Sequence, residues 1–154
     1  MNSQNENIVT SRKTRETTTG ELLEALRRMT TIEEFTWEYG DDYINMSLVE
    51  YLKILLEEKN QKKADIIKKS TLNRIYAYQI FAGVKNPSRD KLITLALAMK
   101  LSYEECQRLL RIAVVGELYI KNMRDSIIIF GLINGLEIWE LNELLYEMDE
   151  FVLE

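Results

Sequence analysis

The sequence predicts an all-α protein, and three observations support this fold class. Apolar residues recur at spacings of three and four along most of the chain, as they do on one face of a helix. Several of these stripes follow a Ser or Thr with a Glu three residues later, the capping box that begins many helices. A helical segment also recurs further along the chain at an offset of 35 residues.

The N-terminal part divides into a polar tail and a helical arm. Residues 1–17 carry no periodic pattern, and we expect them to be disordered. The sequences Thr18–Glu21 and Thr30–Glu33 both have capping-box spacing, so each predicts the start of a short helix. Gly40 and the two aspartates after it end the second helix. We therefore expect a helical arm over residues 18–46.

The middle of the chain predicts three helices in close succession. A capping box at Ser47–Glu50 begins the first, which runs to about Lys59. Shorter apolar patterns predict the next two at about 62–69 and 73–82. Gly83 follows directly and suits the left-handed conformation that ends many helices.

Two further helices are predicted after the only proline. Ser88 caps the first, and a capping box at Ser102–Glu105 begins the second, which runs through Ile112. The later run Ile127–Phe130 is β-branched and, taken alone, could equally be a buried strand.

An internal repeat resolves this ambiguity. At an offset of 35 residues, nine residues between 89 and 118 match identical types between 124 and 153. Because the first copy has strong helix caps, we predict that the second is helical too. One helical hairpin cannot bury its apolar face alone, so the two copies are expected to pack together.

Composition makes an enzyme the least favoured class. The 154 residues are 46% hydrophobic and 29% charged, which predicts a globular chain of one domain with an appendage or two very small domains. Histidine is absent and Cys106 is the only cysteine, so zinc sites and Cys–His nucleophiles are not expected. We expect no catalytic residue, metal or cofactor, and interpret Cys106 as a core thiol. Without an apolar run of about 20 residues or a signal peptide, a cytoplasmic protein without a membrane partner is expected.

Positive charge is concentrated in the middle of this acidic chain. Residues 47–100 contain eleven basic and five acidic side chains, a local charge of +6. Residues 1–46 carry −4 and residues 101–154 carry −7, giving −5 overall. A basic island of this kind is what a polyanion-binding face needs, because phosphate neutralisation supplies most nucleic-acid affinity.

The segment from Lys62 to Ser88 resembles the helix-turn-helix of phage-repressor-like (Cro- and XRE-type) DNA-binding domains. The resemblance is carried by Ile66, the run Asn73–Gly83 and the loop Asn86–Ser88. It extends from Ser47 to about Ile112 and implies a DNA-binding domain over residues 47–116.

This resemblance also implies which residues touch double-stranded DNA. Those facing the major groove would be Asn73, Arg74, Ile75, Tyr78 and Gln79. Those contacting phosphates would be Lys62, Lys63, Lys85 and Asn86. The helix would be held to the core by Ala77, Ile80 and Phe81. The implied function is a transcriptional regulator that reads operator DNA, with repression the expected outcome.

Two departures from the family pattern keep a second class open. Ile67 stands where the family usually has alanine, and Thr71 stands where it usually has a turn glycine. A bulky Ile67 would widen the angle between the two helices, and Thr71 could require a different turn. With the apolar side chains of Ile75 and Tyr78, these departures favour a protein-interaction module, antitoxin-like or adaptor, as the alternative.

The segment 117–154, which repeats 89–118, is expected to form a C-terminal hairpin. Because one small helix-turn-helix domain buries little DNA surface, we expect a homodimer, with this acidic hairpin as its interface or as the docking site of a protein partner. Packing onto its own chain is the alternative. The interface candidates are Trp139, Leu141, Leu144, Leu145, Tyr146, Met148, Phe151, Val152 and Leu153.

A second resemblance concerns the threonines before the first helix. The run Arg15–Gly20 resembles the acidic-threonine sites that bacterial Ser/Thr kinases modify and phosphothreonine-binding domains read. It implies that Thr17, Thr18 and Thr19 are candidate phosphorylation sites. A phosphate just before a helix start would be favoured by the helix dipole. Plain helix capping explains Thr18 without a kinase.

Overall fold

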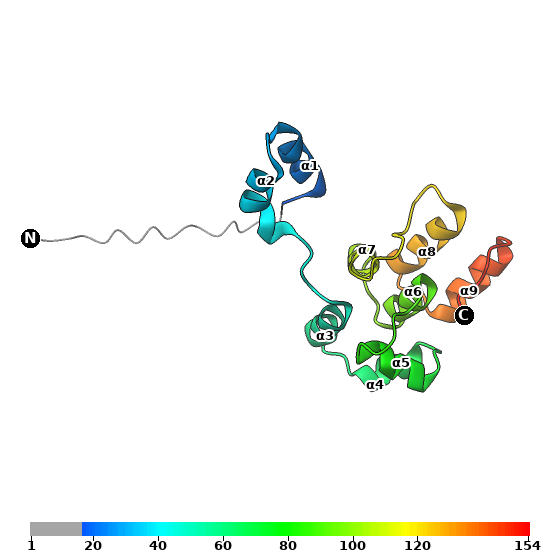
Figure 1. Ribbon diagram of the computed structural model, residues 1–154. Helices are drawn as coiled ribbons and strands as arrows, with labels where there is room; N and C mark the ends of the chain where they lie inside the picture. Colours follow the sequence, from blue (N-terminus) through cyan, green and yellow to red (C-terminus); the bar gives the residue numbers. More distant parts are fainter. Residues whose placement is uncertain (1–16) are drawn as a thin grey trace, which may run out of the picture. The chain divides into compact units, whose positions relative to one another are not determined.

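The computed structural model describes residues 17–154, and every regular element in that range is helical (Figure 1). The all-α prediction is confirmed. The described chain falls into two compact units that divide between Asn45 and Met46. No helix within the described range is long and apolar enough to cross a membrane. The predicted tail lies outside the described residues except for its last residue, Thr17.

The first unit contains α1 (Thr19–Arg28), α2 (Ile32–Tyr39) and a 3₁₀ turn, η1 (Gly40–Asp42). The Thr18 capping box at the start of α1 is confirmed, since its hydroxyl and the Glu21 carboxylate each bond the other residue's backbone N–H.

The predicted box at Thr30–Glu33 is wrong by one residue. The side chain of Thr31 caps α2 by accepting a hydrogen bond from the Glu34 N–H at 3.3 Å. Two adjacent threonines each have a glutamate three residues later, so the spacing alone could not distinguish them. Helix α2 therefore begins at Ile32, and Phe35 within it is buried beside the Tyr39 and Tyr43 rings.

The second unit contains seven helices among its described residues. The capping roles predicted for Ser47, Ser88 and Ser102 are confirmed, each side chain accepting from a backbone N–H three residues later. The ambiguous run Ile127–Phe130 lies inside a helix, as the repeat predicts. The helices are α3 (Leu48–Glu58), α4 (Lys63–Lys69), α5 (Arg74–Phe81), α6 (Arg89–Ala98), α7 (Tyr103–Ile112), α8 (Met123–Ile133) and α9 (Ile138–Glu147).

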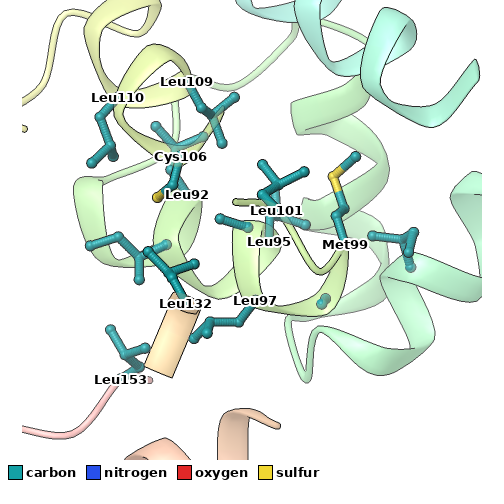
Figure 2. Packing of buried hydrophobic residues seen from close by; sticks show 14 of the residues in the cluster. Leu92, Leu95, Leu97, Met99, Leu101, Cys106, Leu109, Leu110, Leu132 and Leu153 are labelled. Atoms are coloured by element: carbon teal, nitrogen blue, oxygen red, sulfur yellow. The ribbon is translucent and has the colours of Figure 1, made fainter. Parts of the chain in front are cut away.

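Helix α6 is the centre of this unit. Figure 1 shows it between α4 and α5 on one side and the C-terminal helices on the other, and it packs against α4, α7, α8 and α9. All seven residues from Leu92 to Ala98 are buried. Figure 2 shows Cys106 among leucine side chains from α6, α7 and α8. The thiol is buried, which confirms that Cys106 is a core thiol. One core therefore joins the segments on both sides of residue 116.

The sequence repeat recurs in the polar contacts. In the first copy, the Gln107 side-chain amide exchanges two hydrogen bonds with the backbone of Leu118, at 2.8 and 2.9 Å. Thirty-five residues later, Asn142 makes the same pair of bonds with Leu153, at 2.9 and 2.8 Å. Residues with positive φ also recur at this offset, in the pairs Lys100 with Gly135 and Val114 with Asp149.

The two hairpins, α6–α7 and α8–α9, are related by an approximate two-fold axis. Arg89 of the first hairpin pairs with Asp125 of the second at 2.7 Å, and Arg124 of the second pairs with Asp90 of the first at 2.8 Å. Helix contacts are reciprocal in the same way, since α6 packs on α9 and α7 packs on α8. If the second hairpin were a simple translation of the first, only one of the two ion pairs and only one of the two helix contacts would be expected. A two-fold operation converts each contact into the other and so gives both.

Candidate nucleic-acid interface

Helices α4 and α5 are joined by a tight turn with a buried polar centre. Ser70 ends α4 fully buried, and its hydroxyl donates to the Ile67 carbonyl at 2.7 Å while accepting from the Leu72 N–H at 3.3 Å. These bonds satisfy backbone groups that the short helix leaves open. The side chains of Ile66 and Ile67 point into the core, with exposed fractions of 1% and 4%.

Thr71 occupies a left-handed backbone conformation, with φ of +62°. This is the position where the sequence pattern would favour glycine. Threonine takes the conformation that glycine takes most easily, and its side chain remains exposed to solvent. The different turn that Thr71 could have required is therefore not found, because its backbone is left-handed as a turn glycine would be. The bulk of Ile67 is accommodated by burial in the shared core.

The inner face of α5 holds the helix against the core. Ala77 and Ile80 have no solvent exposure and Phe81 is 8% exposed, so the inward role predicted for these three residues is confirmed. Gly83 follows α5 with φ of +77°, and a Cβ there would lie 2.9 Å from the Val49 Cγ2 atom. Both the conformation and the close contact favour glycine at this position.

The outer face of α5 brings together the five predicted groove-facing residues. They line an open, shallow hollow whose lining residues are Asn73, Arg74, Ile75, Tyr78, Gln79 and Ala82. Ile75 is 71% exposed, although it is apolar. Tyr78 and Gln79 are half-buried.

Asn73 has a structural role that limits its part in recognition. Its Oδ1 atom caps α5 by accepting a hydrogen bond from the Tyr76 N–H at 3.1 Å. The carbonyl end of the side chain is therefore occupied. Only the Nδ2 amide group is left to donate to a ligand.

Two cations approach the Tyr78 ring, one from α4 and one from α5. The Lys63 ammonium lies 5.7 Å from the ring centroid, and the Arg74 guanidinium carbon lies 5.8 Å from it. Such cation–π contacts contribute roughly 0.5–1 kcal/mol at exposed sites. They position a cation without neutralising its charge, which distinguishes them from a pairing with a carboxylate.

Most of the basic island is not neutralised by the protein itself. Of its eleven basic residues, Lys59, Arg89 and Lys100 form ion pairs. The other eight form no ion pair with any residue in the described part of the chain. They are Lys53, Lys62, Lys63, Lys68, Lys69, Arg74, Lys85 and Lys91.

The predicted phosphate-contacting residues lie at both ends of this helix pair. Lys62 and Lys63 begin α4, while Lys85 and Asn86 are exposed in the loop between α5 and α6. The sequence reasoning omitted Lys68 and other unpaired cations, although the charge count that defined the island already contained them.

No match to this chain was found among protein-family models, curated proteins or solved structures. Within residues 17–154, no group of three or more His, Cys, Asp or Glu side chains is arranged to hold a metal ion. Burial raises the pKa of the Cys106 thiol to about 12, so a thiolate nucleophile does not form there near neutral pH.

The candidate phosphorylation sites lie at the start of α1. Thr17 is half-buried, whereas Thr18 and Thr19 are exposed. The Thr18 hydroxyl donates to the Glu21 carboxylate at 2.9 Å, so a phosphate on Thr18 would replace this bond and face a like charge.

The predicted interface residues of the C-terminal segment divide into three groups by exposure, of which the intermediate one contains Leu144 and Val152. Leu141, Leu145 and Leu153 are buried in the core of their own chain and are not accessible to a partner. The side chains that remain more than half exposed are Trp139, Tyr146, Met148 and Phe151.

Proposed function

We propose that this protein is a sequence-specific DNA-binding transcriptional regulator, acting as a repressor, in which α4 and α5 form a helix-turn-helix and α5 enters the major groove. The observation that carries the proposal is the set of eight cations that form no ion pair within the described residues, gathered in the segment containing α4 and α5. Phosphates would supply the missing counter-charges, releasing condensed counterions from the duplex.

Base recognition in this proposal depends on Arg74 and Gln79. Both lie on the outward face of α5, and neither side chain is bonded to a carboxylate in the described residues. Arginine pairs bidentately with guanine and glutamine with adenine, so together they could specify two base pairs. The Nδ2 group of Asn73 would add one donor. Lys62 and Lys63 would bind phosphates and fix the register of α5.

The test is selection from a random duplex library, followed by affinity measurement at two salt concentrations. We expect the wild type to recover a motif, with an inverted repeat if two copies bind together. Arg74→Ala/Gln79→Ala should lose the motif, with each residue costing about 1–3 kcal/mol. Lys62→Ala/Lys63→Ala should weaken all sequences alike and lower the salt slope by about one per lysine.

A matched control is Lys121→Ala, which also removes one exposed cation with no ion pair in the described chain, but from the segment before α8. It should leave affinity within about two-fold, because Lys121 lies outside the proposed interface and exposed charges are screened by salt. The proposal is wrong if no motif is recovered, or if Arg74→Ala/Gln79→Ala binds as the wild type does.

A second candidate is docking of a partner protein on the same face of α5. The observation that favours it is the 71% exposure of Ile75 in a hollow that also includes Tyr78 and Ala82. Apolar docking depends weakly on salt, whereas duplex binding through several phosphates falls steeply with salt. Ile75→Ala would abolish partner binding under this candidate, and would leave the salt slope of duplex binding unchanged under the first.

A further inference from the structure

The outward face of α8 is apolar and uncharged. Met123, Phe130 and Ile133 lie along it with exposed fractions of 55%, 54% and 68%, and Ile127 lies between them partly buried. The face is completed by Ser126 and Asn134, whose side chains donate to carbonyls of α8 itself at 2.7 and 2.8 Å. The Ser126 hydroxyl and one donor of the Asn134 amide are therefore satisfied within α8, and the Asn134 Oδ1 atom is left at the edge of the face.

The two-fold relation between the hairpins makes this face of α8 equivalent to a face of α6, and the protein buries the α6 face. The α6 residues equivalent to Ile127, Phe130 and Ile133 are Leu92, Leu95 and Ala98. All three are buried, in a helix against which α4 packs. In the second hairpin, the equivalent side of α8 has no such covering helix, and its apolar side chains remain exposed.

We propose that this surface, called here the α8 surface (Met123, Ser126, Ile127, Phe130, Ile133 and Asn134), binds the α8 surface of a second copy of the chain across a two-fold axis. A two-fold interface places each patch against itself, so it must be free of unpaired like charges. The only charged residues of α8, Arg124 and Asp125, are both paired inside the chain, with Asp90 and Arg89.

Helix α9 offers a weaker surface for self-association. Its exposed aromatic residues, Trp139 and Tyr146, are interspersed with Glu143 and Glu147. A two-fold contact there would bring acidic side chains of both copies together, which is unfavourable. The charge distribution therefore selects α8 and not α9 as the face that meets a second copy.

The exposed area is adequate for a dimer of moderate affinity. Applying the exposed fractions to side chains of this size gives roughly 400 Å² of apolar surface per copy, or about 800 Å² for the pair. The flanking polar residues would bring the total towards ~1,200 Å², the lower end of stable interfaces. This inference does not depend on DNA binding.

The experiment is sedimentation equilibrium of the full chain over a wide concentration range, without DNA. We expect a monomer–dimer equilibrium for the wild type. Phe130→Glu should weaken it at least about 30-fold, because it places a charge at the centre of the interface. Ile133→Glu, a second variant on the same face, should have a similar effect if Phe130→Glu folds poorly.

The matched control is Trp139→Glu on α9, where the replaced side chain is 62% exposed. It should leave the dimer affinity within about three-fold, which is small compared with a hot-spot substitution. Far-UV circular dichroism of each variant reports whether helix content is retained. The proposal is overturned if the wild type is monomeric throughout, if the α8 variants dimerise normally, or if Trp139→Glu dissociates the dimer equally.

Discussion

Replacing Thr71 by glycine should stabilise the protein, although most substitutions do the opposite. The turn between α4 and α5 holds Thr71 at φ +62°, where the Cβ atom of an L-residue crowds the neighbouring carbonyl. Threonine is β-branched and is especially disfavoured in this conformation. The side chain is exposed and forms no hydrogen bond with other described residues, so its removal should sacrifice little packing.

The expected gain follows from two opposing contributions. A left-handed conformation costs an L-residue about 1–2 kcal/mol, and glycine avoids this cost. Glycine also makes the unfolded chain more flexible, which lowers stability by about 0.4–1 kcal/mol. The difference leaves a net gain of about 0.5–1 kcal/mol. For a chain of this size, that corresponds to a rise in Tm of about 1–4 °C.

Urea unfolding followed by circular dichroism measures this gain directly. Asn60→Gly is the matched control, because Asn60 has φ of +50° but asparagine tolerates that region well, so little or no gain is expected. Gly83→Ala should have the opposite sign and cost at least about 1 kcal/mol, because φ is +77° and the new Cβ would press on Val49. A loss of more than about 0.5 kcal/mol in Thr71→Gly would refute the reasoning, since the energetic penalty at Thr71 would then be absent.

Two further substitutions or treatments test the core of the second unit. Arg124→Ala should destabilise this unit by about 2–4 kcal/mol in urea unfolding. The Arg124 side chain is only 16% exposed, and its removal leaves Asp90 without its bidentate partner. The control is Arg27→Ala, in an exposed pair with Glu24, which should cost at most about 0.5 kcal/mol. Cys106 should react with a soluble disulfide reagent only after unfolding, even at pH 9. The reason is that the folded thiol is buried and has a pKa of about 12. Fast labelling of the native protein would contradict this prediction.

Local signals in the sequence were sufficient to predict most of the helices. Capping depends on a side chain and a backbone group three residues apart, so Ser47 and Ser102 could be assigned without knowledge of the fold. The same reasoning failed at Thr30, where a second threonine followed immediately with the same spacing to a glutamate. The strand-like run in α8 was resolved by comparison with its repeat and not by its own residues.

Features that depend on packing could not be predicted in the same way. The repeat indicated two hairpins that bury a common face, but it does not specify how the hairpins are oriented relative to each other. The two-fold relation became clear only from the reciprocal ion pairs of Arg89 and Arg124. The capping role of Asn73 is local, since its Oδ1 atom accepts from the Tyr76 N–H three residues later, and it was missed because the resemblance implied only a DNA contact for this residue. At the predicted interface, the charge count located the basic segment but could not tell which cations form ion pairs.

The pairing of the cations explains how an acidic chain could still present a polyanion-binding face. Arg111 and Arg124, in the C-terminal half, each donate to a carboxylate within 3 Å, so their charges are offset locally. Lys63 and Arg74 instead contact an aromatic ring, which leaves their charges available to a ligand. Because screening limits the reach of exposed charges to about 8–10 Å, the acidic C-terminal segment would do little to offset unpaired cations more than that distance away. The local pairing of charges, and not the net charge of −5, is therefore the relevant quantity for the proposed interface.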